Sequence, residues 1–394
     1  MAVTSAQPRG FRVGAAKAGV KSGRPERLDV ALIVSDRPCI AAGMFTTNQV
    51  IAAPCVLTRR HLERGPIRAI AVNSGNANAC TGEQGERDAV AMAQAAADVV
   101  GCSPYEVAVA STGVIGVPLP VDRIAKALRE IELRENEWQD AARAIMTTDT
   151  RPKSTGVTLD LEAGPVYLRG IAKGAGMIHP NMATMLAFVM TDAAVEAADL
   201  RRILRGAADD TFNAISVDGD TSTNDTVLLL ANGASGIAPR GRDLATLEVG
   251  IRGLCEMLAG EIVADGEGVT KVFEVRVRGA ASIEDARRAA RTITTSSLVK
   301  TAIHGADPNW GRILAAAGRS GARVETAKAT IRIADVVVFD RGAPRQFDGG
   351  VVRRVFEQKN IPIELDLGIG AATARAWGTD LSAEYVRINA DYTT

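Results

Sequence analysis

The sequence predicts an α+β protein in which mixed sheets form layers with flanking helices. Apolar residues make up 46% of the 394 residues, which is enough for a large core. Aromatic residues account for only 4%, whereas Ala, Val, Ile and Leu are plentiful, so we expect an aliphatic core. Strand and helix patterns alternate irregularly rather than as strict βαβ units. This irregular order favours sheet packed on sheet with helices outside, or helices over a mixed sheet.

The first half of the chain contains both types of pattern. Residues 86–100, ERDAVAMAQAAADVV, have the apolar spacing of a helix, and Gly101 is a good terminator for it. Residues 156–174 alternate apolar and polar side chains around Ala163-Gly164-Pro165, which indicates a hairpin. Further helices are expected at 121–135 and 137–146, and buried strands at 106–111 and 185–190.

The second half continues the alternation. Residues 282–293 have helical spacing, and Ser282 is a candidate N-cap. Other helices are expected at about 195–212 and 244–262. Strands are expected at 226–231 and 271–279, and a strand or hairpin at 329–340. Two more short segments with an apolar pattern lie at 361–368 and 384–389.

Charge and cysteine content exclude several classes of function. Lys plus Arg and Asp plus Glu both number 46, so no net charge attracts nucleic acid or an anionic membrane. No apolar run approaches the ~20 residues that span a bilayer. The five cysteines are odd in number and form no CxxC pair, so we expect neither a disulfide framework nor a structural zinc site. These features predict a cytoplasmic protein that binds neither nucleic acid nor membrane.

Histidine-based catalysis has little support in the sequence. The chain contains three histidines and no G-x-S-x-G motif, and nothing nominates a particular cysteine as a nucleophile. The loop VDGDTSTND, 217–225, does not fit a calcium-binding EF-hand, because Thr223 and Leu229 occupy the positions that require Gly and Glu. A polar turn network near a pocket is the better interpretation of this loop.

Thr184 offers a different kind of nucleophile. It follows the Gly- and Pro-rich KGAGMIHPNMA and begins the apolar run TMLAF. A threonine hydroxyl is activated when the base is the residue's own α-amine, which titrates near pH ~8. That amine exists only after the Ala183–Thr184 bond is cut. By spacing alone, a threonine that hydrogen-bonds to backbone at a strand edge is the commoner interpretation.

The segment KGAGMIHPNMATMLAF, 173–188, resembles the signature of the ArgJ family, the ornithine acetyltransferases (glutamate N-acetyltransferases) of arginine biosynthesis. Other segments along the whole chain resemble the same family, in order: PRGFRVGAAKAGVK, MFTTN, AVNSGNANACTG, ASTGVIG, MTTDT, SVDGDTSTNDT, DGEGVTK, KTAIHGADPNWGR and RINADYTT. The fold that this resemblance implies is a DmpA/ArgJ-like layered sandwich, with a threonine nucleophile of the Ntn-hydrolase type.

The resemblance also implies how the enzyme is made and what it does. Self-cleavage between Ala183 and Thr184 would give an α chain, 1–183, and a β chain, 184–394, which together form one enzyme unit. A ping-pong reaction would move acetyl from N-acetylornithine to Thr184 and then to glutamate. No metal or organic cofactor is expected, acetyl-CoA as a second acetyl donor stays open, and the expected assembly is a heterotetramer of two chains of each kind.

Site residues are implied by the same motifs. Thr184 would be the nucleophile, and Thr112 and Gly113 would stabilise the oxyanion. The substrate contacts implied by the resemblance are Thr147, Lys173, Thr184, Glu267, Asn389 and Thr394. We interpret Lys173 as the counter-ion of the substrate carboxylate and Glu267 as the partner of the ornithine ammonium.

Two rival functions remain open on the sequence. One is an amidase or aminopeptidase of the same architecture that transfers the acyl group to water. The other is a non-enzymatic, uncleaved protein that binds an acetylated amino acid.

Overall fold

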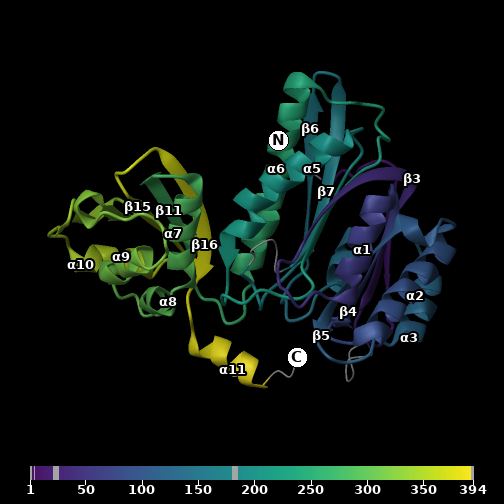
Figure 1. Cartoon of the computed structure of the whole chain (residues 1–394), viewed down its shortest axis with the longest axis horizontal. Helices are drawn as coiled ribbons and strands as arrows, with labels where there is room; N and C mark the ends of the chain where they lie inside the picture. The colour runs from purple at the N-terminus through teal and green to yellow at the C-terminus, as the bar shows by residue number, and fades with distance from the viewer. Residues whose placement is uncertain (1, 4, 21–25, 180–184, 392–394) are drawn as a thin grey trace.

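The computed structural model describes residues 2–3, 5–20, 26–179 and 185–391, and these residues form two lobes (Figure 1). The first lobe contains one long sheet with strand order β1-β6-β7-β8-β10-β3-β4-β5, and β2 also pairs with β3. Its strands are β1 Ala2–Val3, β2 Phe11–Ala16, β3 Val30–Phe45, β4 Ile67–Asn76, β5 Val107–Val114, β6 Lys153–Leu161, β7 Gly164–Lys173, β8 Leu186–Thr191 and β10 Thr226–Ala231.

The long strand β3 allows this sheet to fold over on itself. Residues 40–45 of β3 pair with β10, whereas residues 30–35 pair with β2 and residues 30–39 with β4. Apolar side chains from both halves of the sheet, such as Phe188 and Leu228 from one half and Ile33 and Ile70 from the other, share a single buried cluster. The two halves therefore pack face to face.

Helices cover both outer faces of this sandwich. The outer side of the β6-β7-β8-β10 half packs against α5 Ala197–Asp210 and α6 Gly241–Ala264. The outer side of the other half packs against α2 Gly82–Val100 and α3 Val121–Glu130. Helices α1 Ala53–Arg64 and α4 Trp138–Ala144 contribute to the central cluster. The predicted α+β sandwich with outer helices is confirmed.

The second lobe is a sheet with helices on one face. Its strand order is β14-β13-β12-β15-β11-β16-β9. The strands are β9 Ile215–Ser216, β11 Val272–Ala280, β12 Thr330–Ile333, β13 Val336–Asp340, β14 Ala343–Pro344, β15 Asn360–Asp366 and β16 Ala372–Thr379, and the helices are α7 Ile283–Thr295, α8 Ser297–His304, α9 Trp310–Gly318 and α10 Gly349–Phe356. Alternate residues of β11 (Phe273, Val275, Val277) pack under these helices, which leaves Arg276 and Arg278 on the opposite face.

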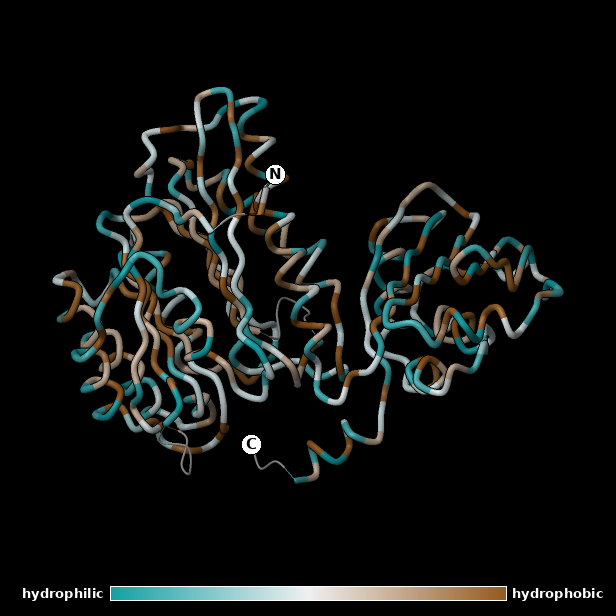
Figure 2. The backbone as a smooth tube through the Cα atoms, turned by 180° about the vertical axis from the view of Figure 1, so that it is seen from behind, coloured by the Kyte–Doolittle hydropathy of each residue, from teal (hydrophilic) through white to brown (hydrophobic). Residues whose placement is uncertain are grey.

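Apolar segments follow the strands and the inner sides of the helices in both lobes (Figure 2). The last helix, α11 Ala383–Asp391, has no buried residue and runs back from the second lobe (Figure 1). In the described part of the chain, no helix combines the length and apolar character needed to cross a membrane.

Several sequence predictions are confirmed with shifted ends. Helix α2 ends at Val100 and is capped by Gly101, which has a φ of 69°, and the Ser282 side chain accepts a hydrogen bond from the Asp285 backbone N–H at the start of α7. The predicted hairpin is β6–β7, although its two turn residues are Glu162 and Ala163, because Leu161 pairs with Gly164. The last predicted segment, 384–389, lies in helix α11.

One helix is shorter than predicted. The pattern over 121–135 extends five residues beyond the end of α3 at Glu130. The backbone of Arg134 instead exchanges two hydrogen bonds with Val13, at 2.8 and 3.0 Å. A contact with a residue distant in sequence therefore overrides the local helical spacing.

Candidate active site

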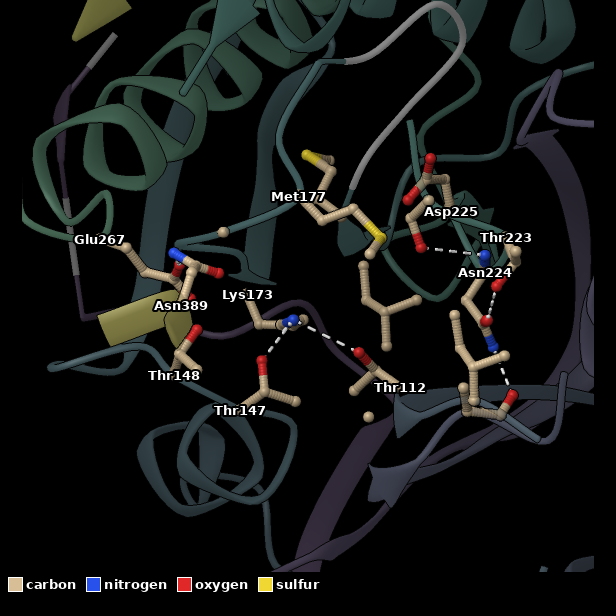
Figure 3. A pocket seen from close by; sticks show the side chains of 17 residues that line it. Thr112, Thr147, Thr148, Lys173, Met177, Thr223, Asn224, Asp225, Glu267 and Asn389 are labelled. Carbon is tan, nitrogen blue, oxygen red and sulfur yellow. Dashed lines mark hydrogen bonds between the residues drawn. The ribbon is translucent and has the colours of Figure 1, made fainter. Parts of the chain in front are cut away.

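A cavity of about 140 Å³ lies where the ends of β5, β7 and β8 approach the loop 222–225 (Figure 3). Thr112, Gly113, Thr147, Lys173, Glu267 and Asn389 all line this cavity. These six residues come from segments up to 277 positions apart in the chain. The fold therefore brings together residues that the sequence shows only as separate motifs.

Thr112 and Gly113 end the parallel pair β4–β5. Gly113 has a φ of 134°, and a Cβ at this position would overlap the backbone of Gly75 and Asn76 on the neighbouring strand. Only glycine fits such a close backbone approach in this conformation. The strand end thus presents the Thr112 hydroxyl and the neighbouring backbone to the cavity at fixed positions.

Lys173 is the last residue of β7 and is 7% exposed. Its Nζ donates to Thr147 Oγ1 at 2.7 Å and to Thr112 Oγ1 at 3.3 Å (Figure 3). Burial lowers the pKa of Lys173, whereas the charge of Asp149 acts in the opposite direction. The cavity therefore contains a cation that is poorly hydrated and held by two hydroxyl groups, which is suited to a ligand carboxylate.

A buried ion triad supports this wall of the cavity. Lys153 is fully buried, and its Nζ lies 2.7 Å from Asp149 Oδ1 and 2.6 Å from Asp265 Oδ2. Asp149 also accepts hydrogen bonds from the backbone N–H groups of Thr147 and Gly174. Burial raises the pKa of Asp149, but Lys173 and Lys153 outweigh it and lower this pKa to about 2.

The triad joins two separate parts of the cavity wall. Asp149 holds the backbone beside Thr147 and Lys173, whereas Asp265 lies two residues before Glu267. Lys153 bridges the two carboxylates, so it links the segment beside Lys173 to the segment that carries Glu267. The sequence analysis did not identify these three residues. The only signal for them was that Asp149 and Asp265 lie within two of the family motifs.

Glu267 forms the acidic end of the cavity. Its backbone N–H donates to Ala175 O at 3.0 Å, and its Oε2 accepts from Asn389 Nδ2 at 2.8 Å. A Cβ at Gly176 would overlap the Glu267 carboxylate, so a larger residue there would displace this carboxylate from its present position. Because Asn389 lies in α11, this helix contributes directly to the cavity (Figure 3).

The polar loop 217–225 closes the other side of the cavity, as the sequence predicted. Asn224 Nδ2 donates to Ala77 O at 2.5 Å and to Ser111 O at 2.9 Å, and Asn224 Oδ1 accepts from Thr223 Oγ1 at 2.6 Å. Thr46 Oγ1 donates to Ser222 O at 2.6 Å. The loop is therefore fixed to β5 and to the end of β3 by side-chain hydrogen bonds.

Three of the expected site residues lie outside the described residues: Ala183, Thr184 and Thr394. Met185 and Leu186, which follow Thr184 in the sequence, line the cavity. Further lining residues that the sequence analysis missed are Ala77, Ile115, Thr148, Gly176 and Met177.

The arrangement suits a small zwitterionic ligand. Lys173 contributes an ammonium group to the cavity and Glu267 a carboxylate, and Lys173 lies between Glu267 on one side and Thr112 on the other (Figure 3). Such a site complements a molecule that carries both a carboxylate and a cation.

Comparison with known proteins adds independent information. A model of the ArgJ family matches residues 12–394. The Arginine biosynthesis bifunctional protein ArgJ of Symbiobacterium thermophilum is 50% identical over 392 residues, covering 98% of each chain. The protein of the same name from Thermus thermophilus is 49% identical over 391 residues, covering 98% of this chain and 99% of that one.

A solved structure is also similar. The crystal structure of the Arginine biosynthesis bifunctional protein argJ from Bacillus halodurans has a TM-score of 0.51 and 42% identity, and covers 53% of this chain and 100% of that chain. Because the family model spans nearly the whole sequence and relatives of about half identity match from end to end, this chain belongs to the ArgJ family.

Proposed function

We propose that this ArgJ-family enzyme is a self-processing acyltransferase that moves acetyl from N-acetylornithine to glutamate. The observation that carries the proposal is the convergence of Thr112, Gly113, Lys173 and Glu267 on one small cavity whose wall continues into Met185. The relatives named for arginine biosynthesis support the choice of substrates.

The proposed reaction has two acyl-transfer steps. The free α-amine of Thr184 takes the proton from its own hydroxyl, and Oγ attacks the acetyl carbonyl of N-acetylornithine. Thr112 and the Gly113 backbone N–H stabilise the negative charge on the carbonyl oxygen. The C–N bond then breaks, ornithine leaves with the proton, and acetyl remains on Thr184. The α-amine of glutamate then attacks this ester, the bond between the acetyl carbon and Thr184 Oγ breaks, Oγ takes the proton that the amine loses, and N-acetylglutamate leaves.

Each substrate group has a proposed partner. The α-carboxylate, which both substrates share, pairs with Lys173, and Thr147 positions that ammonium through its 2.7 Å hydrogen bond. The side-chain ammonium of N-acetylornithine pairs with Glu267. The Asn389 amide donates to Glu267 Oε2 at 2.8 Å and to Tyr385 O at 3.0 Å, so it must exchange one of these bonds to donate to the side-chain carboxylate of glutamate.

Cleavage at Ala183–Thr184 would leave two interlocked chains. Strands β8 and β10 follow the proposed bond in sequence, yet they lie in the sheet between β7 and β3, which precede it. The Bacillus halodurans chain covers 53% of this one, and residues 184–394 make up 54%. That length supports division at this bond.

We propose that the enzyme contains two chains of each kind and that it is located in the cytoplasm. We further propose that it needs no cofactor, and acetyl-CoA is a candidate for a second acetyl donor.

Mass spectrometry and product analysis test this function together. We expect two chains that meet at Ala183–Thr184, and incubation with N-acetylornithine alone should add one acetyl group to the C-terminal chain. Addition of glutamate should then remove that group as N-acetylglutamate. Release of free acetate with glutamate present would instead identify an amidase. A single 41.3 kDa chain without acetylation would identify a binding protein.

A further inference from the structure

Asp218 binds the outer side of the cavity wall. It is not one of the described residues that line the cavity, yet its carboxylate holds a segment that does. Asp218 Oδ2 accepts from the Met177 backbone N–H at 2.6 Å, and Oδ1 accepts from the Ile178 N–H at 2.8 Å. The Val217 N–H donates to Ile178 O at 2.6 Å. Three backbone groups of this segment are therefore fixed by two neighbouring residues.

The same segment, residues 175–178, contacts Glu267 on its other side. Ala175 O accepts from the Glu267 backbone N–H at 3.0 Å. Gly176 lies so close to the Glu267 carboxylate that a Cβ there would overlap it. The segment 175–178 therefore lies between two carboxylates, and a shift of its backbone away from Asp218 would move the surface against which Glu267 rests.

Met177 has a backbone conformation that depends on Asp218. Its φ is 54°, in the left-handed region that a residue with a Cβ adopts at a cost. In this conformation the N–H groups of Met177 and Ile178 both point at the one carboxylate. Met177 also lines the cavity (Figure 3). The hydrogen bonds to Asp218 therefore compensate for an unfavourable backbone conformation in the cavity wall.

Asp218 also contacts helix α11. A side-chain hydrogen bond joins it to Tyr385, and burial together with the charge of Asp218 raises the pKa of Tyr385. Tyr385 lies one helical turn before Asn389, whose amide donates to Glu267 Oε2 at 2.8 Å. Because α11 has no buried residue, its position depends on a few polar contacts of this kind. Asp218 therefore supports the surroundings of Glu267 from two directions.

The second lobe fixes the backbone beside Asp218. Lys300 of α8 is 4% exposed, and its Nζ donates to Val217 O at 2.7 Å and to Thr379 Oγ1 at 2.9 Å. Burial lowers the pKa of Lys300 to about 8, whereas the charges of Asp218 and Asp380 act in the opposite direction. The peptide group before Asp218 is therefore held by a buried cation, so the carboxylate has a fixed base.

We propose that Asp218 is a positioning residue for the side-chain ammonium of the substrate, because it holds the segment 175–178 and α11 around Glu267. The inference rests on the proposed function, since it uses the assignment of Glu267 to the ammonium of N-acetylornithine. Asp218 acts through Glu267 and not on the reacting atoms. Its loss should therefore weaken binding of the ammonium and leave the chemical steps beside Thr112 and Gly113 unchanged.

Steady-state kinetics of the processed D218N enzyme tests the proposal. The substitution keeps the shape of the side chain, but an amide has only one acceptor oxygen, so one N–H of the segment 175–178 loses its partner. We expect KM for N-acetylornithine to rise about fivefold, within the range usual for residues coupled by direct contact. The value of kcat should stay within about twofold of the wild type.

A double-mutant cycle with E267Q shows whether Asp218 acts through Glu267. In the E267Q background, D218N should change KM by less than about twofold, because the charge that Asp218 positions is already absent. The matched control is D243N. Asp243 accepts from the backbone N–H groups of Glu162 and Ala163 in the β6–β7 turn, at 2.9 and 3.3 Å, and does not line the cavity. D243N should leave KM unchanged.

A second variant and a second measurement cover the case in which D218N is misfolded or unprocessed. Y385F removes only the hydroxyl that contacts Asp218, and it should raise KM in the same direction by a smaller factor. Calorimetric titration with ornithine measures binding without acetyl transfer, and its Kd should rise in D218N and Y385F but not in D243N. Thermal melting of every variant shows whether it is folded.

Each outcome supports or overturns the proposal. A rise in KM that disappears in the E267Q background supports it, whereas an equal rise in both backgrounds shows that Asp218 acts independently of Glu267 and overturns it. Wild-type values of KM and Kd in folded D218N or Y385F overturn it as well. A wild type that binds ornithine but transfers no acetyl contradicts the proposed function alone, and the ornithine Kd values then decide on Asp218. A wild type that does not bind ornithine overturns both.

Discussion

Replacing Glu267 with glutamine separates the two proposed substrates. N-acetylornithine carries a side-chain ammonium that the Glu267 carboxylate attracts, whereas glutamate carries a carboxylate that it repels. Glutamine has the same shape and keeps a carbonyl oxygen for the Asn389 amide, which donates to Glu267 at 2.8 Å. The change therefore removes the charge while the cavity wall keeps its form.

The size of the effect follows from the position of Glu267. A hydrogen bond to a charged group contributes about 1.5–3 kcal/mol. Glu267 is only partly buried, so the lower end of this range applies. We expect kcat/KM for N-acetylornithine to fall about tenfold, because 1.4 kcal/mol corresponds to one factor of ten. For glutamate, kcat/KM should stay equal or rise.

Steady-state kinetics with each substrate varied in turn measures the two values separately, because each half-reaction of a ping-pong enzyme has its own kcat/KM. The control is E248Q, which removes a carboxylate from the exposed face of α6, where Glu248 pairs with Arg202 at 2.6 Å. Equal loss for both substrates in E267Q, or a loss for glutamate alone, would refute the assignment of Glu267 to the ornithine ammonium.

Three further predictions concern processing and stability. The variant T184A should remain one 41.3 kDa chain in denaturing mass spectrometry and form no N-acetylglutamate, and a T184A chain that still splits would contradict autocatalysis. The variant K153M should lose about 3–5 kcal/mol of unfolding free energy in urea, because Asp149 and Asp265 would stay buried without their shared cation. The exposed control K126M should change by less than about 0.5 kcal/mol, and an equally small loss in K153M would count against the triad. Burial raises the pKa of Asp149, but the charges of Lys173 and Lys153 outweigh burial and lower this pKa from 3.8 to about 2. Ionised Asp149 therefore stabilises the folded state fully above about pH 4, and this stabilisation is lost as the pH falls through 2. Between about pH 4 and pH 2, the unfolding free energy of D149N should therefore fall less steeply than that of the wild type. An unchanged slope would show that Asp149 does not contribute to this pH dependence.

Local pattern predicted many of the elements because their signals lie within a few residues. Gly101 ends α2 and Ser282 caps α7, and each effect depends on neighbouring backbone groups. The prediction over 121–135 was too long because Val13, more than a hundred residues away, pairs with Arg134. No local pattern contains such a contact.

The sequence by itself was enough to identify the family motifs and the patterns of aliphatic residues that predict layered sheets. Only the tertiary structure decided that Thr112, Lys173, Glu267 and Asn389 meet at one cavity, and that Lys153 is buried between two carboxylates. The physical reason is one of range: periodicity and capping depend on near neighbours along the chain, whereas burial, pKa and ligand geometry depend on groups that only the packing of distant strands brings within a few ångströms.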